Sequence, residues 1–480
     1  MTARSKKERM ALPRTPMPER PADERVHDFG EVNKGFTEQL ALLEAERCLR
    51  CPRPRCVEGC PVGVRIEEFV GLVAEGRYAE AAAVVHADNA LPGVCGRVCP
   101  QESQCEQVCV LAKKGKPIAV GHLERFVADW AREHEGPLPA ASPTSSGYRV
   151  AVVGSGPAGL TCAADLVGLG HDVTIFEALH EPGGVLVYGI PEFRLPREIL
   201  EAEIARLEHL GVRVETNAPI GLAETIDDLL EAFDAVFVGV GAGLPRFLNI
   251  PGEHLIGVYS ANEFLTRVNL MQAYRPDAET PIFDLVERDV VVFGGGNTAL
   301  DAARTAVRLG AASVTVAYRR TENEMPARVE EVRHAREEGV KFTFLTAPLE
   351  LLGDDDGWLV GVRLQSMELG EPDDSGRRRP VPVPGSEEKL AVSVAVVAVG
   401  NAPNPLIRHG SDDLELTRWG TLVTDPETAA TSKPGVFAGG DIVTGGATVI
   451  LAMGAGRRAA EAIDGYVRTG VWHDEAPGEG

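Results

Sequence analysis

Hydrophobic residues follow a helical period in the first part of the chain and a strand period beyond it. Ile66, Phe69, Val70 and Val73 lie three or four residues apart, which is the spacing of an amphipathic helix. A helical N-terminal domain is therefore predicted. It has an extended lead-in over residues 1–36 and helices at residues 37–47, around residues 66–73, at residues 78–87 and around residues 123–130.

A linker rich in Pro, Ala, Ser and Gly, residues 136–147, follows these helices. Beyond it, short β-branched runs at residues 148–153 and 172–176 flank an Ala/Leu-rich helix, and residues 289–318 repeat this βαβ pattern. Residues 373–388 are polar and predict a surface hairpin or loop. The pattern indicates an α/β protein with two Rossmann-like dinucleotide-binding domains behind the helical domain.

The predicted domain order contains one insertion. A chain of 480 residues is long enough for about three domains. We predict a helical domain at residues 1–140, a first dinucleotide-binding domain split between residues 148–284 and 400–470, and a second one inserted at residues 285–399.

Composition excludes several classes of protein. A formal charge of −23 argues against a nucleic-acid binder, which needs a basic face. No apolar run approaches the roughly 20 residues of a membrane span, and the chain does not open with an apolar signal segment. We therefore expect a cytoplasmic protein that binds neither nucleic acid nor a membrane.

Eight of the nine cysteines fall into two close groups, and the ninth, Cys162, is expected to pack inside a helix. Closely spaced thiolates ending in Cys-Pro are typical of loops that bind [4Fe-4S] clusters, and eight are enough for two clusters. Disulfides fit poorly because nothing marks the chain as secreted, and the spacings are less typical of structural zinc. The groups are Cys48, Cys51, Cys56 and Cys60, followed by Pro61, and Cys95, Cys99, Cys105 and Cys109.

The first βαβ unit carries a G-x-G-x-x-G fingerprint for a dinucleotide pyrophosphate, formed by Gly154, Ser155, Gly156, Pro157, Ala158 and Gly159. Glu177 ends the next strand, where an acid can accept hydrogen bonds from a ribose. The order of strand, helix and acid argues against a glycine turn that binds no ligand.

The second fingerprint, formed by Gly294, Gly295, Gly296, Asn297, Thr298 and Ala299, differs at the end of its second strand. Arg319 and Arg320 stand there in place of an acid. A carboxylate repels a 2′-phosphate, whereas guanidinium groups bind it, so NADPH is predicted over NADH. The alternative is a pair of solvated arginines at a strand end.

Near the C-terminus, Gly440 and Asp441 precede Ala447, Thr448 and a helix. This order resembles the closing flavin motif of flavoproteins with two dinucleotide-binding domains. The resemblance implies that Asp441 contacts the ribityl or phosphate part of FAD. The positive end of the helix would lie beneath the flavin ring. The first fingerprint is then assigned to FAD and the second to NADPH.

Further strings extend the resemblance over nearly the whole chain: residues 60–63 (Cys-Pro-Val-Gly), residues 95–100 (Cys-Gly-Arg-Val-Cys-Pro) and residues 181–191, which include Gly184 and Leu186. The chain resembles the small (beta) subunit family of NADPH-dependent glutamate synthases. That family is related to the electron-input half of dihydropyrimidine dehydrogenase and to the large subunit of NADPH–ferredoxin oxidoreductase. The resemblance implies an adrenodoxin-reductase-like fold, FAD, NADPH and two [4Fe-4S] clusters, with Gly184 and Leu186 near the flavin.

The resemblance also implies the ligands of the clusters. One set is Cys48, Cys51, Cys56 and Cys109, and the other begins with Cys60, Cys99 and Cys105. Family members can use a carboxylate or carboxamide for the eighth ligand, a position matched here by Glu124. Cys95 competes for this role, and both alternatives stay open.

The expected function is electron input. NADPH reduces FAD, and the clusters pass electrons to a large FMN-containing subunit that makes glutamate from 2-oxoglutarate and glutamine-derived ammonia. Hydride transfer needs positioning, so no catalytic side chain is predicted. One alternative is the large subunit of a bifurcating NADPH–ferredoxin oxidoreductase, with a ferredoxin-reductase-like partner, or of a sulfide dehydrogenase; another is a non-catalytic docking protein. Formation of a homo-oligomer stays open.

Overall fold

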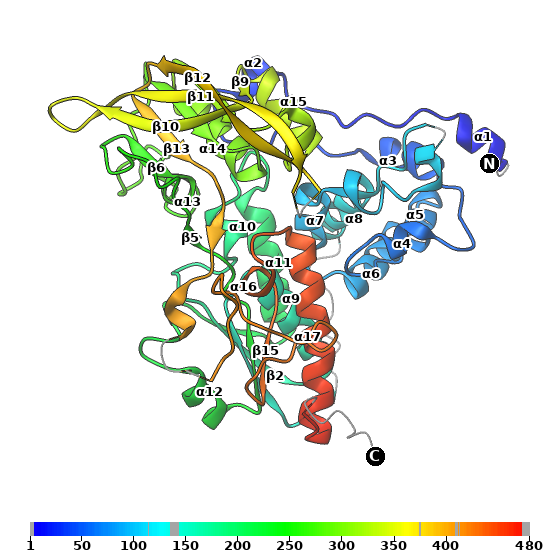
Figure 1. The fold of residues 1–480 in the computed structure, drawn as a ribbon. Helices are drawn as coiled ribbons and strands as arrows, with labels where there is room; N and C mark the ends of the chain where they lie inside the picture. Colours follow the sequence, from blue (N-terminus) through cyan, green and yellow to red (C-terminus); the bar gives the residue numbers. More distant parts are fainter. Residues whose placement is uncertain are drawn as a thin grey trace.

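The computed structural model describes residues 4–113, 115–134, 144–373, 376–408, 411 and 413–472. A helical domain comes first and lies to the right in Figure 1. Its main helices match those predicted, but α4 and α7 were not predicted. Of the linker predicted at residues 136–147, residues 136–143 lie outside the described residues. The helices are α3 (Glu38–Ala45), α4 (Arg55–Glu58), α5 (Ile66–Ala74), α6 (Tyr78–Asp88), α7 (Pro92–Val98) and α8 (Val120–His134).

The predicted lead-in is not simply extended over its described residues, 4–36, and that prediction was wrong. They contain α1 (Lys6–Ala11) and α2 (Ala22–Arg25), and the segment between Glu19 and Asn33 folds back into an antiparallel bridge. Arg25 is almost fully buried, and its guanidinium group donates to carboxylates of α15 (Val329–Glu337) and the residue after it. A buried arginine needs such partners, so the segment packs against a distant part of the chain.

The first Rossmann-like sheet is fully parallel, in the order β15-β4-β1-β2-β3. Buried β-branched residues fill its central strands, and α9 packs against the long helix α17, which descends through the centre of Figure 1. The strand order reverses between β1 and β4, where a dinucleotide site is expected. The elements are β1 (Arg149–Val153), α9 (Pro157–Gly168), β2 (Asp172–Phe176), α10 (Val185–Tyr188), α11 (Arg197–His209), β3 (Arg213–Glu215), α12 (Ile226–Ala232), β4 (Ala235–Val238), β15 (Val436–Ala438), α16 (Asp441–Thr444) and α17 (Val449–Thr469).

The second sheet is also parallel, in the order β6-β13-β7-β8-β9, and it reverses between β7 and β13. It starts earlier in the chain than the predicted boundary at residues 284 and 285. Strand β6 pairs with β13 of this sheet. Helix α13 belongs to the same unit, because it buries apolar side chains in the core of this sheet. The elements are β6 (Val258–Ser260), α13 (Ala261–Asn269), β7 (Asp289–Phe293), α14 (Asn297–Arg308), β8 (Ser313–Tyr318), β9 (Lys341–Phe344) and β13 (Val394–Val397).

Two antiparallel sheets complete the fold. Strands β5 (Leu244–Pro245) and β14 (Asn401–Ala402) pair where the chain passes between the two units. Strands β10 (Thr346–Gly353), β11 (Leu359–Pro372) and β12 (Arg378–Leu390) form a sheet beside the second unit, at the top of Figure 1. The predicted polar hairpin at residues 373–388 thus corresponds to the turn and the second strand of a longer β11–β12 pair, with residues 374–375 outside the described part.

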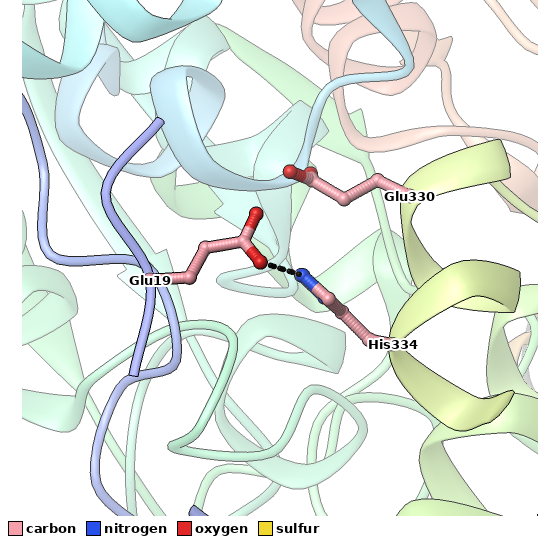
Figure 2. Close-up of side chains that lie close together, drawn as sticks. All are labelled: Glu19, Glu330 and His334. Atoms are coloured by element: carbon pink, nitrogen blue, oxygen red, sulfur yellow. Dashed lines mark ion pairs between the residues drawn. The ribbon is translucent and has the colours of Figure 1, made fainter. Parts of the chain in front are cut away.

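Figure 2 shows Glu19 of the lead-in facing His334 on α15, with Glu330 nearby. Three such side chains can hold a metal ion, but guanidinium groups already neutralise these acids. Arg333 pairs with Glu19 at 2.5 Å, and Arg328 lies 3.3 Å from Glu330. Burial by itself would raise the pKa of Glu19, but hydrogen bonds from His334 and Arg333 outweigh it and lower that pKa to about 2. The cluster is an ion-paired contact that fastens the lead-in to the second unit.

Replacing Glu19 with glutamine is expected to lower the free energy of unfolding by about 1 kcal/mol at pH 7. The folded pKa of Glu19 lies below its ordinary value of 4.5, so the carboxylate stabilises the fold above that pH. This stabilisation is lost as the pH falls from 4.5 toward 2. Urea unfolding at several pH values, with Asp23→Asn as an exposed control, should show a difference that shrinks on acidification. A gap independent of pH would contradict the assignment.

Candidate functional site

The first fingerprint forms a tight turn between β1 and α9. Gly154 has φ +99°, and a side chain there would meet the carbonyl of Gly239 on the neighbouring strand segment. A Cβ at Gly159 would lie 1.9 Å from the Gly154 oxygen, whereas a Cβ at Gly156 would meet nothing within 4 Å. Gly159 therefore serves close packing, and Gly156 leaves room at the start of α9, where Pro157 is the first residue. A pyrophosphate fits at such a position.

These two glycines should respond differently to the same change. Gly159→Ala is expected to destabilise the protein by about 1–3 kcal/mol, because the new methyl group would overlap the backbone. Gly156→Ala should leave stability nearly unchanged and weaken flavin binding instead. Thermal unfolding of the flavin-free protein, followed by flavin titration, separates the effects. Equal stability of the two variants would argue against this division.

Glu177 lies at the end of β2, as predicted, and is buried. The backbone N–H and the hydroxyl of Ser155 both donate to Oε2 of Glu177, and the Leu179 N–H donates to Oε1 at 2.8 Å. The Ser155 hydroxyl also accepts from the Gly183 N–H at 2.8 Å. Ser155 thus ties the acid to the glycine turn, a role that its place inside the fingerprint did not reveal. Oε2 thus accepts two hydrogen bonds and Oε1 only one, so Oε1 keeps a lone pair for a ribose hydroxyl.

The C-terminal motif lies against the same turn. A Cβ at Gly440 would come within 3.0 Å of the Ala158 Cβ, so the two motifs are in contact. Asp441 accepts from the Ala447 N–H at 3.2 Å, and burial raises its pKa to about 6. Thr448 caps α17 by accepting from the Leu451 N–H. Residues far apart in the sequence therefore surround one site.

Residues 183–188 close the same site from another side. Gly184 has φ +55°, and a Cβ there would lie 2.9 Å from the Gly156 Cα, so this loop covers the glycine turn. Leu186 is buried in the large apolar core. Tyr188 was not singled out from the sequence, yet burial raises the pKa of its phenol to about 12, with further contributions from the charges of Asp441 and Glu177. Tyr188 therefore lies within electrostatic reach of both acids of the site.

The second fingerprint repeats the first at the β7–α14 turn. A Cβ at Gly294 would lie 2.4 Å from the Ala398 carbonyl oxygen, and Gly296 is open apart from a distant contact. Asn297 accepts from the Arg328 N–H at 3.0 Å, and Thr298 is exposed at the start of α14. The strand order changes at the same place, between β7 and β13, so this turn has the geometry of a dinucleotide site.

The two predicted phosphate-binding arginines have different environments. Arg320 is buried and donates to the Arg378 carbonyl at 2.7 Å and to Asp373 at 2.6 Å, which fixes the β11–β12 hairpin to the end of β8. Arg319 is exposed to solvent, although part of its side chain is covered. This partial burial lowers the pKa of its guanidinium group, and the nearby positive charges of Arg320 and Arg377 lower that pKa further. Cations collected next to a glycine turn favour an anion. Arg319 is the one directed to solvent.

Four cysteines of the helical domain line one cavity, namely Cys48, Cys51, Cys56 and Cys109. Burial raises the pKa of Cys48 to about 11 and that of Cys56 to about 12, and repulsion between neighbouring thiolates adds to both shifts. Such thiols ionise readily only beside a compensating positive charge. All nine cysteines lie in the described residues and are free thiols. Four cysteines that line one largely apolar cavity fit an iron–sulfur cluster.

A second cavity is lined by Cys60, Cys99, Cys105 and the carboxylate of Glu124. Burial raises the pKa of Glu124 to about 7, against the effect of a 2.7 Å hydrogen bond from Asn89. Cys95 on α7 does not line this cavity. Its sulfur lies 3.4 Å from the sulfur of Met453 on α17 and 3.7 Å from the Asn89 side-chain oxygen. Three cysteines and one glutamate therefore line this cavity, together with Gln101 and Gln104.

The second cavity also touches the helix that begins at the flavin motif. Ile450, in the first turn of α17, lines it together with the cysteines. One turn later, Gly454 packs on the backbone of Pro61, and Arg457 donates to the Val62 carbonyl at 2.8 Å. Cys105 lies within electrostatic range of Cys56 of the first cavity. The first cavity is therefore next to the second, and the second cavity is next to α17.

Two family models match the chain. Residues 25–136 match dihydropyrimidine dehydrogenase domain II, 4Fe-4S cluster, and residues 148–459 match pyridine nucleotide-disulphide oxidoreductase. The chain is 40% identical over 452 residues to the glutamate synthase [NADPH] small chain of Halomonas elongata, covering 93% of this chain and 95% of that one. The chain belongs to the glutamate synthase small-chain family. Family membership makes it an oxidoreductase with an iron–sulfur domain.

Two further similarities place this family member among wider relatives. It is 41% identical over 439 residues to the NADP(+)-dependent formate dehydrogenase subunit beta of Moorella thermoacetica, covering 87% of this chain and 60% of that protein. Mycobacterium tuberculosis FprA in complex with NADPH matches with a TM-score of 0.56 and 23% identity over 67% of this chain and 86% of that one, and supports the fold. Among the described residues, no helix has the length and apolar character to span a membrane.

Proposed function

We propose that this small chain oxidises NADPH at its second fingerprint, holds FAD at its first, and delivers electrons through two [4Fe-4S] clusters to a partner that makes glutamate. The observation that carries the proposal is the contact between α17 and the second cysteine cavity. Ile450 belongs to both the first turn after the flavin motif and the wall of that cavity. Electrons leaving a flavin there have a short path into the helical domain.

The chain's own residues bind and orient the cofactors. The open glycines Gly156 and Gly296 admit a pyrophosphate at each helix start, and Glu177 accepts the ribose hydroxyls of FAD. Arg319 binds the 2′-phosphate of NADPH, and Asp441 faces the ribityl or phosphate portion of FAD. When bound, FAD supplies the conversion from hydride to single-electron transfer. No acid, base or nucleophile is required.

The two cysteine cavities support an assignment of the cluster ligands. Cys48, Cys51, Cys56 and Cys109 hold the outer cluster, while Cys60, Cys99 and Cys105 with Glu124 hold the inner one. Glu124 is favoured over Cys95 because Glu124 lines the inner cavity and Cys95 does not; the Cys95 sulfur lies beside Cys99 and 3.4 Å from the sulfur of Met453. The partner would be a large FMN-containing glutamate synthase subunit; the small-chain names of the relatives support a larger partner chain.

Anaerobic titration of the purified holoenzyme with NADPH tests this function. Flavin bleaching followed by the electron paramagnetic resonance signals of reduced clusters is expected. Addition of the large glutamate synthase chain of the same cells, with glutamine and 2-oxoglutarate, should then reoxidise the protein and form glutamate. If NADPH reduces the flavin and the clusters but no electrons pass to the large chain, the protein is an NADPH oxidoreductase with a different electron acceptor.

The second candidate is electron input to a different oxidoreductase complex. The 41% identity to a formate dehydrogenase beta subunit shows that this module also occurs outside glutamate synthases. Near-complete coverage of the Halomonas small chain, at 95%, favours the first candidate.

A further inference from the structure

The outer cysteine cavity lies under a surface formed by α1, the Cys48–Cys60 loop and the turn after Cys109. Arg9 of α1 donates to the Cys48 carbonyl at 2.7 Å, and Arg4 pairs with Glu46 after α3 at 2.5 Å. These contacts hold α1 beside the cavity. In Figure 1, α1, α3, α4 and α5 lie at the far right, away from both dinucleotide-binding units.

This surface carries cations although the whole chain is acidic, with a formal charge of −23. Four basic side chains are exposed and have neither an ion pair nor a hydrogen bond among the described residues: Lys6, Lys7, Arg53 and Arg55. Lys6 is close enough to Cys51 to lower the pKa of that thiol against the larger, raising effect of burial. Three carboxylates nearby, Glu8 of α1, Glu58 and Glu67, also have no ion pair among the described residues, so the four cations exceed them by one.

Apolar side chains are also exposed on α1, on the neighbouring helix α3 and beside Cys109. Met10 of α1, Leu43 of α3 and Val110 beside Cys109 are 40%, 46% and 44% exposed. Val110 also lines the outer cavity together with Arg55. Lys6, Lys7, Met10, Leu43, Arg53, Arg55 and Val110 define what we call the cluster face. Apolar side chains ringed by charge are typical of a protein interface.

The inner cavity meets α17, and the outer cavity lies beyond it, so the cluster face is where electrons leave. Cys99 and Cys105 of the inner cavity are buried, whereas the cysteines of the outer one are partly exposed. We propose that the cluster face docks an acidic surface of the electron-accepting partner chain, with the cations steering the encounter and the apolar side chains forming the contact. This proposal rests on the proposed function and names the place and the chemistry of its partner contact.

The electron balance is simple. One NADPH gives NADP⁺, a proton and two electrons, and the oxidised partner takes up both electrons in two single steps through the docked face. The partner is the oxidant, and no bond to this chain is made or broken.

A charge-reversal triple variant, Lys6→Glu, Lys7→Glu and Arg53→Glu, tests the docking. Arg55 stays unchanged because it lines the cavity. At low ionic strength, the second-order rate constant for reduction of the large glutamate synthase chain should fall at least tenfold. In the wild type this rate constant should also fall with added salt, and the variant should lose that salt dependence.

A matched control reverses three exposed cations elsewhere: Lys341, Lys389 and Arg418. It should reduce the large chain at the wild-type rate. Reduction of a neutral quinone, menadione, by NADPH should be the same in all three proteins, because it does not depend on the face. Equal losses in the two reversal variants, or none in the first, would overturn the docking proposal alone. Failure of the wild type to reduce the large chain would overturn the proposed function and this inference with it.

Discussion

Replacing Arg319 with glutamate is expected to raise the KM for NADPH about 100-fold, because a charge-assisted contact of about 1.5–3 kcal/mol becomes a repulsion. Oxidation of NADH should change little, since NADH has no 2′-phosphate. Arg319 is exposed beside the second glycine turn and has no hydrogen bond or ion pair among the described residues. Steady-state reduction of menadione with each nicotinamide measures both constants.

Arg320 provides the matched comparison. Its guanidinium group is held by the Arg378 carbonyl and by Asp373, so it braces the hairpin rather than facing solvent. Arg320→Met should lower thermal stability and impair NADPH and NADH alike. A selective loss of NADPH in this variant, or an unchanged preference in Arg319→Glu, would contradict the division of roles between the two arginines.

Replacing Glu124 with alanine is expected to remove the inner cluster, so that iron falls from about eight to about four atoms per chain. Electron transfer to the partner should be almost abolished, while NADPH-dependent flavin reduction persists. Glu124 lines the inner cavity with three cysteines, and a missing ligand leaves that donor set incomplete. Iron and sulfide analysis with electron paramagnetic resonance of the reduced protein measures the loss.

Two companion variants decide between the candidate ligands. Glu124→Gln keeps an oxygen donor and should retain iron, and Cys95→Ser should also retain it, because the Cys95 sulfur lies against Met453. Loss of four iron atoms in Cys95→Ser, with full content in Glu124→Ala, would make Cys95 the eighth ligand instead.

Local patterns in the sequence determined the elements that carry the chemistry. The period of apolar residues predicted the main helices of the first domain and the two βαβ units, because an amphipathic segment buries one face whatever it packs against. The spacing of the glycines predicted both turns, since only a residue without Cβ fits where Gly154 and Gly294 meet neighbouring backbone. The two cysteine groups predicted a metal-binding domain.

Only the tertiary structure decided what depends on distant contacts. The folding of the lead-in follows from Arg25 and its partners more than 300 residues away, and the place of β6 follows from its pairing with β13. Neither contact has a local signal. Likewise, Arg319 and Arg320 are adjacent residues of the same type, so the sequence does not show which one binds an anion. Only the contact of Arg320 with Asp373 of the hairpin distinguishes them.

The sequence by itself determined the kinds of cofactor sites and their order along the chain, because those depend on short motifs. The tertiary structure decided which donors share a cavity, which arginine faces solvent, and that α17 joins the flavin motif to the inner cysteine cavity. These features arise when separate segments pack together, and packing places side chains that no local spacing relates.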